Sequence, residues 1–168
     1  RYFIVSKHAR LGCVLVAGAA KSIRARDRWI GWGQNQRLKN LPWVVNNTRF
    51  LIFPWVRVRY LASHVLGQVA RRLRQDWYAR WGYRPVLLET FVDPARFQGT
   101  CYQAAGWISL GETTGEGLPR PGRHYATTPK LIYVRPLVKD FRLQLCSLAL
   151  PGRVEQSQQA CSPFTSTF

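Results

Sequence analysis

Acidic residues are scarce in this sequence, and methionine is absent from it. Eight of the 168 residues are Asp or Glu against 25 Lys and Arg, so the formal net charge is +17 and the isoelectric point is near 10.9. This excess goes far beyond what solubility requires and makes a polyanion, above all nucleic acid, the first partner to consider. Most of the basic residues are arginines, which suit bidentate phosphate contacts. A GC-rich genome that encodes Arg in place of Lys is the alternative explanation.

Long apolar runs and a secretion leader are absent as well. The longest apolar stretches, such as Val14–Ala20 and Phe50–Val56, are much shorter than the roughly 20 residues that a membrane-spanning helix needs. No basic and then apolar segment with a cleavage site opens the chain. We therefore expect a cytoplasmic protein without membrane contact. Because the chain starts with Arg and contains no Met, we also expect a fragment, or a gene without its start, in which the first elements of the fold are missing.

Neither the four cysteines nor the three histidines are spaced as metal ligands. The sequence has no CxxC pair, so we predict no metal site and expect free thiols in a reducing cytoplasm. Cys101, directly before Tyr102, could be a nucleophile, which would need a base within hydrogen-bond reach and a setting that favours the thiolate. No histidine is close in sequence, although His64 could approach in the fold. We predict that Cys101 is instead a buried, unreactive thiol.

The N-terminal part of the chain contains three β-rich segments. Tyr2–Val5 and Cys13–Ala17 are separated by a polar turn and should form two paired strands. Val44–Phe53 should form a further strand that Asn46 and Asn47 interrupt early and that a proline ends. These two asparagines could bind a ligand or cap a turn, and turn formation is the commoner role.

A strand–helix–strand unit follows. Residues 60–78 are predicted to be helical because apolar side chains recur every four residues; these are Leu61, Val65, Val69, Leu73 and Trp77. Gly82 is a helix stop signal, and Val86–Val92 is a nearly continuous apolar run typical of a buried parallel strand. The unit predicts a βαβ crossover in which residues 48–53 and 86–92 are parallel neighbours. The fold class is therefore α/β with a mixed sheet.

Shorter elements are predicted after this crossover. They are a short helix at Gly99–Ala105, a strand at Trp107–Gly111, a last strand at Leu131–Arg135 and a short helix at Asp140–Leu148. From Pro151 the sequence is polar and without periodicity, so we expect one domain over residues 1–150 and a disordered tail over residues 151–168.

The order of these elements resembles the GNAT acyltransferase fold, and so does the placement of Tyr102 a few residues before Gly106-Trp107. The resemblance implies that Tyr102 is the general acid that protonates a departing CoA thiolate. It also implies that the turn into the long helix binds the pyrophosphate of acetyl-CoA or another acyl-CoA, since helix N-termini favour anions. The implied cofactor residues are Arg59, Tyr60, Leu61, Ala62, Ser63 and His64. Ala62 and His64 stand where glycine or a small residue is usual.

A second resemblance covers roughly residues 1–147. The segments that support it are DRWIGW, NLPWVVNNTRFLIFPWVRVRYLASHVLG, RPVLLETFVDPARFQGTCYQAAGW and RPLVKDFRLQLC. In this order they resemble the DruA family of Druantia anti-phage systems, whose members also occur beside or fused to transposases. The resemblance implies a role in defence or in mobile elements, with other defence-module or transposase proteins as partners. It does not imply a particular reaction.

Glu89 is the only charged residue of its predicted strand. By alternation it faces the same side as Leu87 and Phe91. A carboxylate in a central strand is costly unless it is paired, and such groups often serve as bases with raised pKa. Glu89 is therefore a candidate catalytic base, and the alternative is a structural ion pair with an arginine, for instance Arg49.

Arginines and tryptophans supply the candidate nucleic-acid contacts. Arg120 and Arg123 lie in the Gly- and Pro-rich loop at residues 111–123, which we favour as the contact with phosphate. The other candidates are three arginines of the long helix, Arg71, Arg72 and Arg74. Aromatic residues among basic ones can stack on bases, although a core position is the commoner role of a tryptophan; the tryptophans concerned are Trp29, Trp32, Trp43 and Trp55.

Two functions follow from this sequence. The first is a basic, nucleic-acid-contacting accessory protein, with DNA a better candidate than RNA, on a GNAT-like scaffold that has lost catalysis. The second is an active acyl-CoA-dependent N-acyltransferase.

Overall fold

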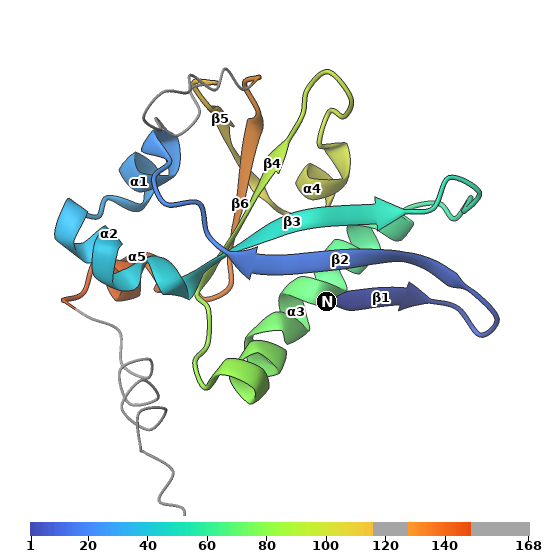
Figure 1. Ribbon diagram of the computed structural model, residues 1–168, viewed down its shortest axis with the longest axis horizontal. Coiled ribbons are helices and arrows are strands. Elements are labelled where there is room, and N and C mark those ends of the chain that lie inside the picture. The colour runs from blue at the N-terminus through green and yellow to red at the C-terminus, as the bar shows by residue number, and fades with distance from the viewer. Residues whose placement is uncertain (116–127, 149–168) are drawn as a thin grey trace, which may run out of the picture.

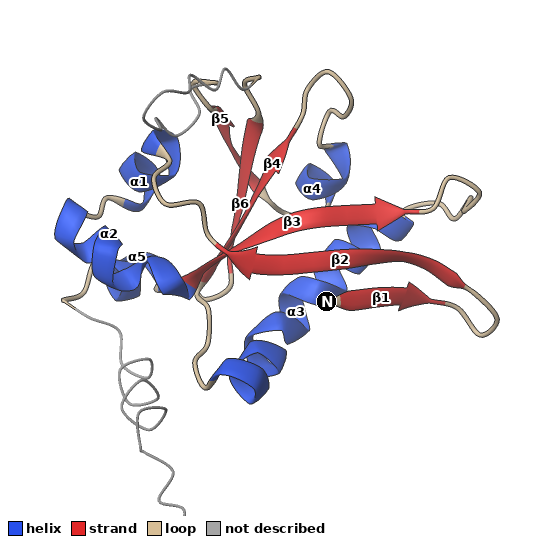
Figure 2. Ribbon diagram, in the orientation of Figure 1, coloured by secondary structure: helices blue, strands red, loops and turns tan. Residues whose placement is uncertain are grey.

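The computed structural model describes residues 1–115 and 128–148, whose strands form a six-stranded mixed sheet with helices on both faces (Figures 1 and 2). The strand order is β1-β2-β3-β4-β6-β5. In chain order the elements are β1 (Tyr2–Val5), β2 (Arg10–Gly18), α1 (Arg24–Ile30), α2 (Gln34–Asn40), a 3-10 turn (Leu41–Trp43), β3 (Val44–Ile52), α3 (Leu61–Trp81), β4 (Leu87–Val92), α4 (Thr100–Ala104), β5 (Ile108–Glu112), β6 (Leu131–Pro136) and α5 (Phe141–Leu145).

The predicted βαβ crossover is confirmed. β3 and β4 are parallel neighbours, and α3 connects them. Their pairing is short, because only residues 44–46 of β3 lie opposite residues 87–89 of β4. Beyond this point the two strands diverge (Figure 1). The parallel pairing had been predicted for residues 48–53 of β3. In the structure it involves residues 44–46 of this strand instead. Gly82 ends α3 with a φ of 74°, a left-handed conformation that glycine adopts without strain.

Side chains of the central strands alternate between two cores. Val44 of β3, Leu87 of β4 and Ile132 of β6 point toward a cluster that includes residues of α1 and α5. Their neighbours Val45, Leu88 and Tyr133 point to the other face, where Leu66 and Leu73 of α3 and Tyr102 of α4 complete a second cluster. Because both faces are covered, these strands need apolar residues at consecutive positions, which explains the continuous apolar run of β4.

The apolar stripe of α3 packs on the sheet as predicted. Val65, Val69 and Leu73 are buried, and Leu61 packs at the edge of the same surface. The first two pack against Ile4 and Val14 of the β1–β2 hairpin. The hairpin is antiparallel and was correctly predicted, although β2 is longer than expected at both ends.

Some local predictions differ from the structure. Asn46 and Asn47 do not interrupt β3, because both stay in its ladder with β2. α1 lies in a basic, Trp-rich segment to which the sequence assigned no helix. The tail and the favoured phosphate loop cannot be compared with the structure, because residues 116–127 and 149–168 lie outside the described residues. Among the residues described, no helix is both long and apolar enough to cross a bilayer.

Candidate functional site

The first candidate site is the N-terminus of α3, where the GNAT resemblance places pyrophosphate. Arg59 precedes the helix, and its guanidinium lies 4.8 Å from the ring centre of Tyr60. Tyr60 is 70% exposed and has a φ of 59°, the one positive φ of a non-glycine residue among those described. A left-handed tyrosine costs free energy that the surrounding turn must supply. The N–H of His64 already bonds the carbonyl of Tyr60, so the free helical N–H groups are those of Ala62 and Ser63.

His64 lies on the exposed side of this turn. Its Nε2 is 3.4 Å from Nε2 of Gln68, one turn further along α3. The Ser63 hydroxyl donates to the carbonyl of Tyr60 at 3.1 Å. The six predicted cofactor residues therefore form one contiguous turn at the surface, and the two candidate anion contacts there are the Arg59 guanidinium and the helix N-terminus.

The second candidate site is the divergence of β3 from β4, where the Tyr102 hydroxyl lies. This hydroxyl donates to Oδ1 of Asn47 at 2.8 Å, and the Thr90 hydroxyl donates to the Asn47 carbonyl at 2.9 Å. Tyr102 is buried, with its ring stacked on Tyr133 and edge-on to Trp107. Burial raises the pKa of Tyr102 to about 12. In this conformation the phenol is a structural hydrogen-bond donor that holds α4 on β3.

Asn47 is the centre of this network and also fixes an irregularity in the sheet. The register between β2 and β3 shifts between Leu15, opposite Arg49, and Val16, opposite Asn47, so Thr48 is an extra residue. The amide of Asn47 donates to the carbonyls of Leu15 and Arg49, the pair beside the bulge, at 3.0 and 2.8 Å. Asn47 therefore lies within a strand and does not cap a turn, the commoner role considered from the sequence.

Glu89 belongs to a buried ion-pair network on the opposite face of the sheet. One carboxylate oxygen accepts a bond from Nη1 of Arg26 at 2.8 Å and the other from the Ala20 N–H at 2.8 Å. The side chains of Glu89 and Arg26 are fully buried. Arg26 also donates to Asp27, which accepts a bond from the Trp32 indole. Burial raises the pKa of Glu89, and the guanidinium opposes this shift.

This geometry supports the structural alternative for Glu89 rather than the role of a base. Both carboxylate oxygens already accept hydrogen bonds, and solvent does not reach them. The partner is Arg26 of α1 and not Arg49, the arginine considered from the sequence. One signal was present: Arg26 lies three residues after Ile23 and four before Ile30, so it falls on the inward face of α1.

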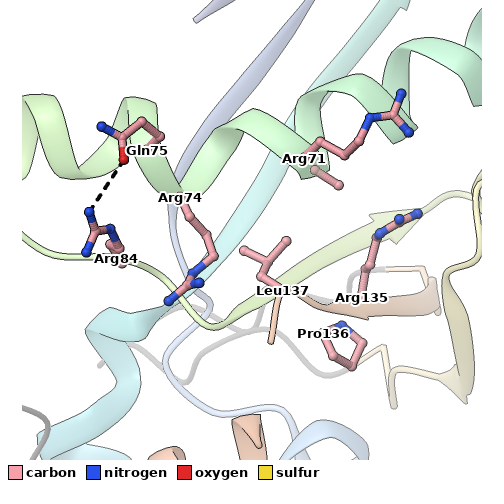
Figure 3. Close-up of a pocket in the computed structure, with 8 residues that line it drawn as sticks. Arg71, Arg74, Gln75, Arg84, Arg135, Pro136 and Leu137 are labelled. Carbon is pink, nitrogen blue, oxygen red and sulfur yellow. Dashed lines mark hydrogen bonds between the residues drawn. The ribbon is translucent and has the colours of Figure 1, made fainter. Parts of the chain in front are cut away.

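The three arginines of α3 have different surroundings. Arg72 is exposed and forms an ion pair of 2.7 Å with Asp76, which lowers the pKa of that carboxyl. Arg71 and Arg74 instead line a cavity of about 370 Å³ together with Arg84 and Arg135 (Figure 3). No sequence signal linked these arginines, because they come from α3, the segment before β4 and the end of β6.

The tryptophans and Cys101 are mostly parts of the core. Trp32 and Trp43 are buried, which confirms the commoner role for these two. Trp55 is 70% exposed and stacks on Phe53 with ring centres 4.6 Å apart. Cys101 is half-buried rather than buried, and burial raises the pKa of its thiol, which disfavours the reactive thiolate.

The molecule is thus a strongly basic α/β protein with a central βαβ crossover, two buried polar networks and an arginine-lined cavity. Comparison with protein families assigns it further. The model of the family described as Druantia protein DruA matches residues 1–119, and the chain belongs to this family. Membership indicates a component of the Druantia anti-phage defence system. The match contains β1 to β5 and ends before RPLVKDFRLQLC, a segment that contributed to the resemblance seen in the sequence. No curated protein matches the chain.

Proposed function

We propose that this protein is the basic, nucleic-acid-contacting accessory component of its defence system or of a related transposon module, and that DNA is its principal ligand. The family supports a defence role with protein partners. The observation that supports nucleic-acid contact is the net charge of +17, together with the small number of ion pairs in the part of the chain that the structure describes.

The described ion pairs show how little of this charge is neutralised. In residues 1–115 and 128–148, carboxylates pair only with Arg26, Arg37, Arg72 and Arg96. The other basic side chains described have no carboxylate partner. An uncompensated basic surface attracts the phosphate backbone and releases its counterions on binding, which gives sequence-tolerant, salt-dependent affinity.

Two groups of arginines are the proposed contacts. The first is the loop pair Arg120 and Arg123, outside the described residues, where glycine N–H groups could add to the guanidiniums. The second is the α3 pair Arg71 and Arg74, which the structure separates from the internally paired Arg72.

The experiment is an anisotropy titration of labelled duplex DNA and single-stranded RNA at several salt concentrations. The logarithm of the binding constant should fall linearly with the logarithm of the salt concentration, by about 0.9 per phosphate contact on duplex DNA. Replacing Arg120 and Arg123 by Gln should reduce this slope by about 1.8 if each contacts one phosphate. Arg96→Gln is the matched control, because this exposed arginine has its own partner in Asp93. No binding at low salt, or binding indifferent to salt, would mean that the charge serves a protein partner.

A GNAT-like acyltransferase is the second candidate, and the divergence of β3 from β4 beside Tyr102 favours it. The GNAT-like scaffold itself is part of our proposal: the parallel strands joined by a long helix, and Tyr102 before Gly106-Trp107, support it. In an active enzyme Arg59 and the first turn of α3 would hold the pyrophosphate of an acyl-CoA, and the Tyr102 hydroxyl would have to leave Asn47 to protonate the thiolate.

Calorimetry with acetyl-CoA tests this second candidate. Weak binding that Arg59→Ala abolishes would support a phosphate site at the start of α3, and His64→Gly should then strengthen binding by opening the turn. Binding at micromolar concentration that survives Arg59→Ala would show that the site is elsewhere. An absence of binding would favour the non-catalytic function.

A further inference from the structure

The arginine-lined cavity lies between the second half of α3 and the sheet, and three segments of the chain form it. Arg71, Arg74 and Gln75 come from α3, Arg84 precedes β4, and Arg135 lies near the end of β6. In Figure 3, Gln75 meets Arg84 at one end of the cavity, Arg74 reaches from the helix toward the segment before β4, and the Arg71 and Arg135 guanidiniums lie at the other end. The cavity volume of about 370 Å³ is enough for a phosphate group with part of the molecule that bears it. The cavity is distinct from the start of α3, where the proposed cofactor turn lies.

All four charged residues that line this cavity are arginines, and no carboxylate lines it. Among the described residues, Arg71 and Arg135 have no hydrogen-bond or ion-pair partner. Partial burial and the nearby charge of Arg71 both lower the pKa of Arg135. Repulsion between the Arg71 and Arg135 guanidiniums makes the folded chain less stable unless an anion enters the cavity. Arg72, directly beside Arg71 in sequence, has Asp76 as its partner, whereas none of the four cavity arginines pairs with a carboxylate of the described residues.

Two of the arginines are held in place by neutral groups. Nε of Arg74 donates to the carbonyl of Pro85 at 3.2 Å, which leaves its terminal nitrogens free to bind a ligand. The Arg84 guanidinium lies 4.3 Å from the ring centre of Tyr78 and donates to Gln75 at 3.4 Å. Neutral partners orient these guanidiniums without neutralising them, so less side-chain entropy is lost when an anion binds.

We propose that this cavity is a binding site for a phosphate group, supplied by the backbone of a nucleic-acid strand. Guanidinium groups match phosphate oxygens in bidentate geometry, and several arginines lining one cavity suit a phosphate better than a single carboxylate. The choice of the strand as the source rests on the proposed function. A free nucleotide shares the same chemistry, and the experiments below separate the two sources.

The first experiment uses inorganic phosphate and thermal unfolding, and it does not depend on nucleic acid. Phosphate at ten times its dissociation constant should raise the melting temperature by about 3–6 °C over chloride at equal ionic strength. The double variant Arg71→Gln/Arg135→Gln should lose this rise, while its melting temperature in chloride should be equal to or above that of the native protein, because repulsion is removed. Arg72→Gln is the control: it removes one charge from the same helix outside the cavity and should keep the rise. An equal rise in the double variant would overturn the proposal.

The second experiment identifies the source of the phosphate. In the duplex DNA titration the salt slope of the double variant should be shallower by about 1.8. A fourfold rise in salt should then reduce the DNA affinity of the native protein about ten times more than it reduces the affinity of the variant. Arg72→Gln should change the slope much less. A lost phosphate response with an unchanged DNA slope would assign the cavity to a free nucleotide and overturn the strand as the source, and competition by adenosine monophosphate in the melting assay would confirm this.

These outcomes separate the cavity from the proposed function. If the native protein does not bind DNA, the proposed function fails, and the phosphate response alone decides whether the cavity is an anion site. If DNA binds but neither the phosphate response nor the slope depends on Arg71 and Arg135, the cavity proposal fails and the proposed function stands. Stabilisation by poly-glutamate without a response to phosphate would assign the cavity to an acidic protein and also overturn the proposal.

Discussion

Replacing Glu89 by Gln removes one charge from a pair that solvent does not reach. Arg26 and Glu89 have fully buried side chains joined at 2.8 Å. Gln could still accept the N–H of Ala20 with its oxygen, but its amide group would then face Nη1 of Arg26 with a donor in place of an acceptor. The guanidinium would keep its bonds to Asp27 and to the Ala20 carbonyl.

The magnitude follows from this change. Removing one partner of a buried ion pair typically costs about 3–5 kcal/mol. Because Asp27 remains as a counter-ion of Arg26, we expect the lower end, about 3 kcal/mol in the free energy of unfolding, or a melting temperature about 6–12 °C lower. The double variant Arg26→Leu/Glu89→Leu removes both charges and should cost less than the two single substitutions to Leu added together.

Urea unfolding monitored by tryptophan fluorescence measures these changes, provided that the dependence on urea stays the same in each variant. A decrease of less than about 1 kcal/mol in the unfolding free energy of Glu89→Gln would refute the argument, because a buried arginine that loses one of its two carboxylate partners should destabilise the fold by more than this. Additive costs in the double variant would also refute it. DNA binding by folded Glu89→Gln protein should equal that of the native protein, because the carboxylate contributes to the fold rather than to a contact with ligand.

Three further predictions concern the other buried groups. Burial raises the pKa of Tyr102 from its ordinary value near 10 to about 12, so the stability that the protonated phenol contributes is complete below pH 10 and is lost as the pH rises to 12. Over this range the free energy of unfolding of the native protein should fall by about 2–3 kcal/mol more than that of Tyr102→Phe. Parallel curves of unfolding free energy against pH for the two proteins would contradict the assignment. Gly99→Ala should lower the free energy of unfolding by about 3 kcal/mol, because the residue has a left-handed φ and the new Cβ would lie only 2.5 Å from the ring of Tyr133. Gly31→Ala, which has a positive φ but open space around it, should lower it by about 1 kcal/mol. Equal melting temperatures of the two variants would show that the contact with Tyr133 relaxes. Alkylation of Cys101 in the native protein at neutral pH should be slower than that of a small-molecule thiol, because burial raises its pKa; rapid modification would restore the nucleophile hypothesis.

The sequence determined the βαβ crossover and the position of the long helix. An apolar residue at every fourth position specifies one buried helical face, and a continuous apolar run specifies a strand covered on both sides. Both signals are local, and the structure contains the predicted α3 and β4 within a few residues. The sequence also marked Glu89, since a charge within an apolar strand needs a partner, and the GNAT resemblance marked Tyr102. The roles of Arg59–His64 in cofactor binding and of Arg120 and Arg123 in DNA contact stay predictions.

Only the tertiary structure decided which partners these positions have. Arg26 and Glu89 are 63 residues apart in sequence and form a hydrogen bond because α1 packs on one face of the sheet. Asn47 and Tyr102 are 55 residues apart and form a hydrogen bond because α4 packs on the other face. Asn46 and Asn47 favour turns locally, yet the ladder of β3 outweighs that preference. The arginine-lined cavity likewise needs α3, the segment before β4 and the end of β6 together. Sequence periodicity shows which side of an element is buried, whereas the distance between two charges depends on how the elements pack.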